Sequence, residues 1–511
     1  MAGNNEKKKK KRSLSPMFFW LLFFISAVVF FVTFWRMPMF PKAWSLYLLA
    51  GLAGIAVIMF LISGFVARRN KAVKVVNIAL TVCMAAGTIL LPYYTDRISR
   101  IFNSVIGDKV NINLYVMTDA YKDAHSDTFG DYIHTEGDVN LDDFRDVTYI
   151  RTSGVDKENQ DYAVEQLVQQ FGQDLNTVEY GTVSEGAQAL YNNYGTVLIM
   201  SEAYESVLAD MEGFESFREE TKVIHTFTRT IKSNYTDKND VKMTSEPFTI
   251  FFGGNDQEGE LSLVGRTDVD MSVTVNPKTH QIVIVSLPRD SYIPNPALYD
   301  SPDKLTHLGL SGIDNTLKGI SAYLDTDIEN YMLINFTTYK KIIDALGGVD
   351  VENPYAFTYT WDKNYHFEEG TIHLDGQAAL YYVRERYSLP DGDFGRNMHQ
   401  QIVMQGIIKK LTSSAALTKF NSLLSALDGT FLTNVSSDSF YALARMQLGD
   451  NAEWNTVSYH LTGAVGSAEC ASMPGMQLSV VFPNEAQAAF VSQVIDEVIS
   501  GEIITQQELP D

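Results

Sequence analysis

Cysteine is almost absent from this 511-residue chain. Only two occur, and Cys83 lies inside an apolar stretch far from Cys470. A disulfide framework needs paired cysteines in one oxidising compartment, so none is expected here, and thiol redox chemistry is disfavoured as a function. The spacing of Cys and His residues also gives no zinc motif.

Positive charge is scarce after residue 95. The formal net charge is −22, and residues 1–95 hold twelve Lys and Arg against the single acid Glu6, whereas the remainder holds 28 basic against 61 acidic residues. An acidic body repels polyphosphate, which argues against nonspecific binding of nucleic acid. The two parts of the chain must face different surroundings.

Three long runs without charge occupy the N-terminal part, at 17–35, 43–67 and 75–94. Each is apolar and long enough to cross a bilayer as a helix. The first run follows a basic tail, residues 1–16, as a signal peptide would. Its apolar core is too long for one, however, and two more runs follow. We therefore expect a multi-pass membrane anchor that stays attached.

The basic residues orient this anchor. Lys7 to Arg12 and the basic 68–74 loop should stay in the cytoplasm by the positive-inside rule. Three crossings then place residue 96 onward outside the cell membrane. The basic run could bind nucleic acid, but an electrostatic contact with anionic lipid headgroups is the simpler interpretation.

Residues 100–245 have the pattern of a small α/β accessory domain. Short β-rich runs at 112–117, 147–151 and 196–200 alternate with amphipathic stretches at 161–171 and 201–211. The segment has no nucleophile elbow, Walker loop or metal-ligand spacing, so we interpret it as a spacer or interaction module. The polar stretch 232–246 reads as a linker.

Residues 246–500 are predicted to form a second α/β domain, a central mixed sheet covered by helices. Two strands at 269–275 and 281–287 flank the turn from Asn276 to Thr279 and predict a hairpin in the sheet. Helical patterns follow at 311–324, 337–346, 375–386 and 397–411, with β runs at 331–334 and 349–352.

Arginine is rare in this second domain, with six between residues 246 and 511. Arg445 lies within a predicted helix, and the other five lie near element ends: Arg266, Arg289, Arg384, Arg386 and Arg396. Guanidinium groups bind phosphate oxygens bidentately, so several converging would suit a pyrophosphate. Each could instead neutralise a nearby surface acid, and composition alone does not decide.

Local positions add detail to the arginine set. Arg384 and Arg386 fall at the C-terminal end of a predicted helix, where the helix dipole favours cations. Arg396 and Gln400 are spaced i and i+4, so they share one helix face near an N-terminal turn that favours anions.

Two acidic residues flank neighbouring strands. Asp256 follows the run at 248–252, and Asp268 precedes the run at 269–275. Such turns are commonly only turns, but two carboxylates with water and substrate phosphate would suit Mg²⁺.

Three long segments now give a resemblance. The stretches GRTDVDMSVTVNPKTHQIVIVSLPRDSYI (265–293), INFTTYKKIIDALGGVDVENP (334–354) and LDGQAALYYVRERYSLPDGDFGRNMHQQ (374–401) resemble the LytR-CpsA-Psr family over roughly 246–430. The three-span anchor followed by an extra domain is similar in layout to the streptococcal CpsA type within that family.

The resemblance implies an activity and a set of site residues. A polyprenyl pyrophosphate-linked glycan would bind with its lipid in an apolar tunnel, and its phosphoglycan would pass to a peptidoglycan hydroxyl with Mg²⁺. Asp256 and Asp268 would hold the metal. Arg266, Arg289, Arg384, Arg386, Arg396 and Gln400 would bind the donor. Catalysis would involve Arg266, Asp268 and Asp393, the last as general base or as an arginine-orienting group.

Alternatives remain open at this point. The same site could serve a lipid pyrophosphatase with water as acceptor, or a noncatalytic membrane-bound sensor. A transcription regulator is disfavoured because no helix-turn-helix fits before the first span. The CpsA-like layout favours a capsular polysaccharide as the polymer, but a teichoic acid or another wall polymer would need the same chemistry.

Overall fold

The structure is a computed structural model that describes residues 15–66, 71–103, 108–137, 139–231, 242–255, 261–413, 415–428 and 430–508. Asp256, most of the basic tail and most of the 232–246 linker lie outside the described residues. Two units are distinguished, residues 1–100 with 437–452, and residues 101–436 with 453–511. Each is described separately.

The first unit contains the three apolar helices that the sequence predicts: α1 (Pro16–Arg36), α2 (Lys42–Leu61) and α3 (Lys71–Asn103). Many of their large apolar side chains are exposed, Val75 to 63% and Ile89 to 71%, as expected for helices that face lipid. Helix α3 runs beyond the predicted 75–94 at both ends, and an Asp96–Arg100 ion pair at 3.1 Å supports its polar last turns.

A fourth helix from late in the sequence belongs to the same unit, α16 (Ser437–Asp450). The Tyr441 hydroxyl donates to the carbonyl of Thr95 at 2.6 Å, and Arg445 donates to the carbonyl of Pro38 at 3.1 Å. Arg445 is therefore inside a helix, as predicted, and its guanidinium contacts the loop between α1 and α2.

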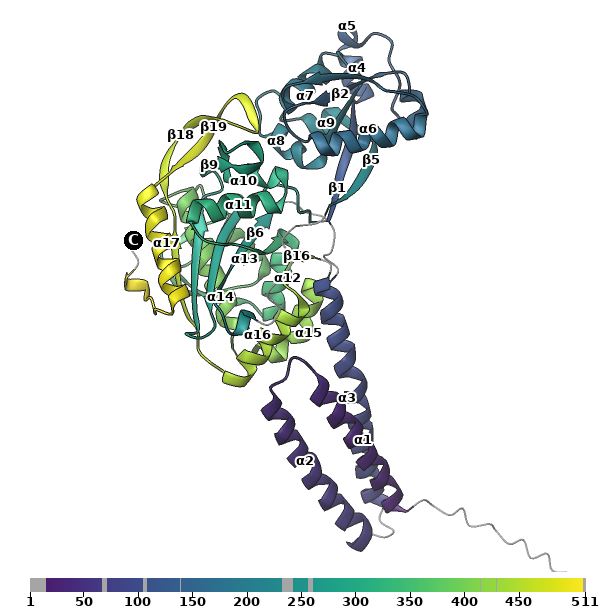
Figure 1. The fold of residues 1–511 in the computed structure, drawn as a ribbon, viewed down its shortest axis with the longest axis vertical. Coiled ribbons are helices and arrows are strands. Elements are labelled where there is room, and N and C mark those ends of the chain that lie inside the picture. Colours follow the sequence, from purple (N-terminus) through teal and green to yellow (C-terminus); the bar gives the residue numbers. More distant parts are fainter. Residues whose placement is uncertain are drawn as a thin grey trace, which may run out of the picture. The chain divides into compact units, whose positions relative to one another are not determined.

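The accessory part of the second unit is a five-stranded mixed sheet with helices on both faces (Figure 1). The strand order is β3-β2-β4-β1-β5. Its elements are β1 (Asp108–Met117), α4 (Asp119–Ala124), α5 (Ser126–Phe129), β2 (Thr148–Thr152), α6 (Lys157–Phe171), β3 (Asn176–Tyr180), α7 (Val183–Tyr191), β4 (Val197–Ser201), α8 (Glu205–Ala209), α9 (Phe217–Glu220) and β5 (Thr221–Ile231).

Alternation along β1 builds the two cores of this sheet. Val110, Ile112 and Leu114 pack with α6, whereas Tyr115 and Met117 pack in the cluster on the α7 side. The predicted helix at 201–211 is interrupted, since only the short α8 is an α-helix and a 3₁₀ turn precedes it. The prediction that this part has an α/β fold is thus confirmed.

The remaining part of the second unit is built on a six-stranded mixed sheet, order β16-β11-β6-β7-β8-β17. Its strands are β6 (Phe248–Asn255), β7 (Val269–Asn276), β8 (Gln281–Leu287), β11 (Asn330–Asn335), β16 (Phe431–Thr433) and β17 (Asn455–His460). Strands β7 and β8 form the predicted antiparallel hairpin, with Asp270 opposite Leu287 and Asn276 opposite Gln281. The central mixed sheet covered by helices is confirmed.

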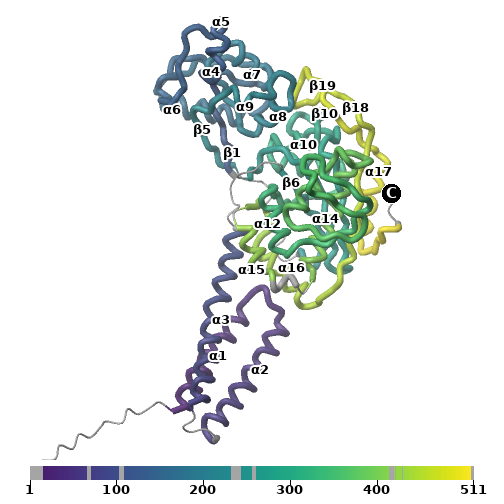
Figure 2. The backbone as a smooth tube through the Cα atoms, turned by 180° about the vertical axis from the view of Figure 1, so that it is seen from behind, coloured from purple at the N-terminus to yellow at the C-terminus, as the bar shows by residue number. Residues whose placement is uncertain are grey.

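Helices cover both faces of this sheet. Val283 and Val285 pack in one cluster with residues of α11 (Ile313–Leu324) and α17 (Glu485–Ser500), the yellow helix of Figure 1. Ile282 and Ile284 point to the opposite face, where side chains of α14 (Asp393–Leu411) pack (Figure 2). The period-two alternation of the strand thus fills two separate cores.

Shorter elements complete the unit: β9 (Tyr292–Asn295), β10 (Ser301–Lys304), α10 (Leu305–Leu308), α12 (Phe336–Leu346), β12 (Val349–Asn353), β13 (Phe357–Thr358), β14 (His366–Phe367), β15 (Gly370–Leu374), α13 (Gly376–Arg384), α15 (Ala415–Leu427), β18 (Gly463–Cys470) and β19 (Met473–Pro483). Helix α14 begins at Asp393, four residues before the predicted 397. Helix α13 ends at Arg384, so Arg386 lies beyond it rather than at its last turn.

Candidate active site

The site begins at one edge of the central sheet, where β6 and β8 end and β7 starts. The backbone N–H of Asp268, one residue before β7, donates to the carbonyl of Gly254 at 2.7 Å. Arg289 follows the end of β8, and its Nη1 forms a short ion pair with Asp268 Oδ1. The β7–β8 hairpin therefore sets the position of both charges.

The N-terminal turn of α14 supplies a second pair. Arg396 Nη2 lies 2.9 Å from Asp393 Oδ1, and Nη1 of Arg386 lies 3.8 Å from the same oxygen. Arg386 also donates from Nη2 to the hydroxyl of Tyr387 at 2.9 Å. Asp393 thus sits between two guanidinium groups, a geometry that orients arginines.

The charges of the two pairs act on each other. Burial works to raise the pKa of Asp268, but the charges of Arg289, Arg396 and Arg266 hold it below its usual range. Burial, with some repulsion from Arg289, lowers the pKa of the Arg396 guanidinium even though Asp393 and Asp268 oppose this. A negatively charged ligand beside Arg396 would offset this cost of burying its charge.

Several buried donors here have no hydrogen-bond acceptor among the described residues. These donors are Nε of Arg289 and both Nε and Nη2 of Arg396. The acceptor Oδ1 of Asp393 likewise has no hydrogen-bond donor among the described residues. The Arg396–Asp393 contact is close, but its N–H is not aimed at the carboxylate. Native proteins rarely leave buried polar groups unsatisfied, and guanidinium N–H groups left open in this way are donors for an oxyanion such as a phosphate.

An apolar cavity of about 40 Å³ adjoins the charged cluster. Gly254 and Val269, which flank the Asp268 backbone, are part of its wall, along with Phe336, Tyr339, Leu380, Val383, Met404 and Ile407. Gln400 also lines it, and the Gln400 amide donates to the carbonyl of Val383 at 3.5 Å. Gln400 therefore faces the cavity rather than the arginines.

Arg384, like Gln400, was predicted to bind the donor but lies outside the cluster around Asp268 and Asp393. The Arg384 guanidinium lies 4.5 Å from the ring centre of Phe336, a cation–π contact, and the side chain is exposed. Because Phe336 lines the apolar cavity, Arg384 stands beside that cavity and not in the Asp268 cluster.

Arg266 is directed toward the accessory domain. The Arg266 Nη1 atom lies 2.5 Å from Asp210 Oδ2 and 3.3 Å from the carbonyl of Ser206 in the short helix α8. Arg266 still contributes to the lowered pKa of Asp268, so it belongs to the rim of the same field. The sequence predicted a spacer or interaction module for the accessory domain and gave no signal for Asp210, which lies 56 residues away from Arg266.

Two further contacts that hold the loops of the site were not predicted from the sequence. The carbonyl of Arg289 accepts from the backbone N–H of Thr306 at 2.9 Å, and the Thr306 hydroxyl donates to the carbonyl of Thr267 at 2.7 Å. Asp290, beside Arg289, pairs with Lys304 at 3.1 Å. One threonine thus ties together the two loops that carry Arg289 and Asp268, and only the tertiary fold reveals it.

Of the two predicted metal carboxylates, the described residues include only Asp268, at this end of the sheet. Asp268 is a partly buried carboxylate whose Oδ1 is paired with Arg289, and Asp256 lies outside the described residues. Mg²⁺ commonly takes one or two protein carboxylates and fills its other positions with water and substrate phosphate. Asp268, beside arginines with open N–H groups, is compatible with that pattern.

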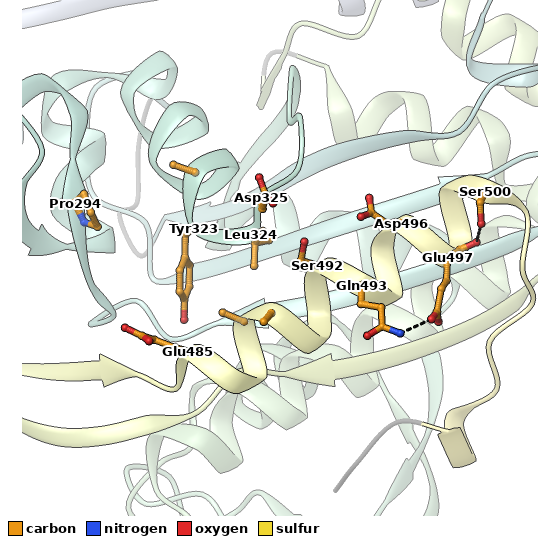
Figure 3. A pocket seen from close by; sticks show the side chains of 13 residues that line it. Pro294, Tyr323, Leu324, Asp325, Glu485, Ser492, Gln493, Asp496, Glu497 and Ser500 are labelled. Atoms are coloured by element: carbon orange, nitrogen blue, oxygen red, sulfur yellow. Dashed lines mark hydrogen bonds between the residues drawn. The ribbon is translucent and has the colours of Figure 1, made fainter.

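A much larger pocket lies elsewhere, between α11 and α17 (Figure 3). It measures about 830 Å³, and its charged lining residues are all acidic: Asp325, Glu485, Asp496 and Glu497. A wall of one negative sign repels a phosphate ligand. Size alone therefore does not identify the site, and the arginine cluster remains the candidate.

Known proteins with similar sequences were compared with this chain. The sequence profile of the LytR_cpsA_psr family matches residues 214–479. A Bacillus anthracis protein named polyisoprenyl-teichoic acid–peptidoglycan teichoic acid transferase TagU is 39% identical over 202 residues, which cover 39% of this chain and 65% of the relative. The chain thus spans just under two thirds of that relative's length.

A protein of the same name from Enterococcus faecalis is 31% identical over 265 residues, covering 51% of this chain and 84% of the relative. Among solved structures, Bacillus subtilis TagV matches with a TM-score of 0.42 at 26% identity, over 50% of this chain and 98% of that one. Protein gbs0355 of Streptococcus agalactiae matches at 0.43 and 26%, over 53% and 95%. The profile match over more than half of the sequence shows that this chain belongs to the LytR-CpsA-Psr family.

Proposed function

We propose that the chain is a membrane-anchored transferase that moves a phosphate-linked glycan from a polyprenyl pyrophosphate carrier to a hydroxyl of peptidoglycan. The observation that carries this proposal is the set of open guanidinium N–H groups on Arg289 and Arg396, beside an apolar cavity. A lipid pyrophosphate needs both kinds of surface at once, and few other ligands do.

In this mechanism the arginines bind the pyrophosphate and the cavity takes the first part of the lipid. The acceptor hydroxyl attacks the phosphorus next to the glycan, the bond from that phosphorus to the bridging oxygen breaks, and polyprenyl phosphate leaves. Arg289 and Arg396 stabilise the charge that develops on the phosphate oxygens. Positioning by fixed guanidiniums would then provide much of the rate.

Asp268 would hold Mg²⁺, with Asp256 as second ligand. Bound there, the ion would supply Lewis-acid neutralisation of phosphate charge. Asp393 lies between Arg386 and Arg396, so we assign it the arginine-orienting role in preference to that of general base. Arg266 would complete the charge at the rim.

The membrane topology is also a proposal. Basic residues before α1 and between α2 and α3 favour a cytoplasmic N-terminus, which would put the catalytic domain outside, where peptidoglycan lies. The polymer is either a capsular polysaccharide, which the domain layout favours, or a teichoic acid, which the names of the relatives favour. Both would reach the site as the same lipid pyrophosphate.

The test uses the full chain in detergent micelles with a lipid pyrophosphate oligosaccharide, peptidoglycan fragments and Mg²⁺, and mass spectrometry of the products. Wild type should form a phosphodiester-joined product, Arg289→Ala should not, and Arg445→Ala should behave as wild type. Free phosphorylated glycan without joined product would indicate a lipid pyrophosphatase instead. Tight donor binding with no turnover would indicate a sensor.

A further inference from the structure

A second polar cluster lies inside the catalytic part, apart from the arginines, between β10, α10 and the β18–β19 hairpin. Its members are Asp303 at 0% exposure, His307 at 4%, Cys470 at 0% and Ser472 at 3%. One potential ligand atom from each of Asp303, His307 and Cys470 lies within 4.8 Å of the other two. Three different metal-binding side chains in one buried place call for an explanation.

The donor atoms form a tight triangle. Asp303 Oδ1 lies 2.9 Å from His307 Nδ1, Ser472 Oγ lies 3.0 Å from that same oxygen, and Ser472 Oγ lies 2.9 Å from His307 Nδ1. In a tetrahedral zinc site with bonds of about 2.0–2.1 Å, such donors are separated by about 3.3 Å. A small outward movement of each side chain would therefore admit one ion.

The surroundings hold the carboxylate in a fixed orientation. Asp303 Oδ2 accepts from Asn295 Nδ2 at 3.0 Å and from the backbone N–H of Ser472 at 3.1 Å, and Asn315 Nδ2 donates to Asn295 Oδ1 at 2.9 Å. Oδ1 is thereby turned toward His307 and Ser472. Outer hydrogen bonds that orient a carboxylate in this way are typical of the support around metal ligands.

Charge balance also favours a cation. Lys304 is next to Asp303 in the sequence, but its ammonium pairs with Asp290 instead. Among the described residues, the buried Asp303 carboxylate has His307 as its ion-pair partner. The Cys470 thiol lies in the same buried cluster. A bound divalent ion would replace the thiol proton and compensate both groups.

We propose that Asp303, His307, Cys470 and the Ser472 hydroxyl form a binding site for one Zn²⁺ ion. A thiolate and an imidazole select zinc rather than magnesium, so this ion would differ from the one at Asp268. The sequence shows no zinc motif because Cys470 follows His307 only after most of the catalytic part.

The site would join segments that support the arginine cluster. The backbone N–H of Ala471 already donates to the carbonyl of Pro302 at 3.0 Å. Thr306, the residue before His307 in α10, donates to the carbonyls of Arg289 and Thr267. A zinc ion would fix the β18–β19 hairpin to β10 and α10. Its role is structural, since none of its ligands touches the arginine cluster.

The test measures zinc directly on the full chain in detergent. Purified protein is loaded with ZnCl₂, dialysed against metal-free buffer, and analysed by plasma mass spectrometry. Wild type should retain about one zinc per chain. Cys470→Ser should retain at least tenfold less zinc, and Cys83→Ser, which changes the other cysteine, should match wild type. Equal zinc content in wild type and Cys470→Ser would overturn the proposal.

A spectroscopic test needs no variant to fold. Co²⁺ added to the wild-type chain should give a thiolate-to-cobalt charge-transfer band, and zinc should abolish the band by displacement. Because ligation releases the thiol proton, the apparent affinity should rise with pH. Absence of the band at saturating Co²⁺, with a normal unfolding temperature, would rule out ligation by Cys470.

Discussion

Asp210 of the accessory domain forms an ion pair with Arg266 of the catalytic part, 2.5 Å between Oδ2 and Nη1. The same Nη1 atom also donates to the carbonyl of Ser206 in α8. Both contacts are made by Nη1 of Arg266, so they do not involve its Nε or Nη2. The accessory domain thus orients an arginine at the rim of the Asp268 cluster.

Replacing Asp210 should therefore slow transfer without preventing it. We expect Asp210→Ala to lower kcat about threefold to fivefold with KM nearly unchanged, because Asp210 is 65% exposed and such ion pairs contribute up to about 1 kcal/mol. Steady-state kinetics of the full chain would measure this. The exposed Glu212 provides the control substitution Glu212→Ala. Faster transfer by Asp210→Ala would show that the pair restrains Arg266 instead.

Removal of one buried arginine should have a much larger effect. Arg396 is 11% exposed and carries two unsatisfied donors, so Arg396→Ala should reduce kcat by about a hundredfold or more, as loss of a fixed oxyanion donor does. Arg396→Lys should restore little, because an ammonium lacks the planar fork. If Arg445→Ala, remote from the cluster, reduced kcat equally, the effect could not be assigned to phosphate binding.

The apolar cavity should discriminate between donors by lipid length. Met404 lines it, so Met404→Phe should fill part of the space and raise KM about tenfold for a long polyprenyl donor. A donor with a short lipid should be affected little, and it serves as the internal control. Equal changes for both donors would indicate general overpacking, which the unfolding temperature would detect.

A buried acid of the accessory domain should control stability at low pH. Asp119 is 7% exposed and accepts from the backbone and hydroxyl of Thr135 and the backbone of Glu136. Burial acts to raise the pKa of Asp119, but these hydrogen bonds bring it below its usual range. The stabilisation is therefore present above the unfolded pKa of about 3.9 and lost as pH falls through the lower folded value.

Asp119→Asn should accordingly destabilise the domain by about 1–3 kcal/mol at pH 7, because the new amide N–H would face backbone donors. The difference from wild type should shrink as the pH falls below about 3.9. Scanning calorimetry of the full chain at several pH values would measure it, with the exposed Asp127→Asn as control. A difference independent of pH would point to a packing defect rather than to lost ionisation.

The local patterns of the chain predicted much of the fold. The β7–β8 hairpin followed from alternating Val and Ile residues around an Asn-Pro turn, and the three membrane helices followed from uncharged length. Strand β5 was missed because its residues alternate between Thr and charged or aromatic side chains, with little buried surface. Helix α14 starts early because Gly392, at φ 55, redirects the chain just before Asp393.

The site was predicted less completely, for a physical reason. Sequence showed that Arg289, Arg386 and Arg396 lie near element ends, and the fold gathers these three around Asp268 and Asp393. It could not show that Arg384 rests on the Phe336 ring, or that Gln400 bonds a carbonyl in the cavity wall. Side-chain direction depends on tertiary neighbours, which spacing along one helix does not specify.

Helix α16 has a practical consequence for anyone who produces a soluble form of this protein. Its Tyr441 and Arg445 donate to carbonyls of Thr95 and Pro38, so a chain cut after residue 100 would lose both acceptors and uncover that face of the helix. The truncated product should aggregate more readily than the whole protein. Low yield or weak turnover from such a fragment would then reflect a damaged boundary, and detergent-solubilised full-length protein is the safer material for assays.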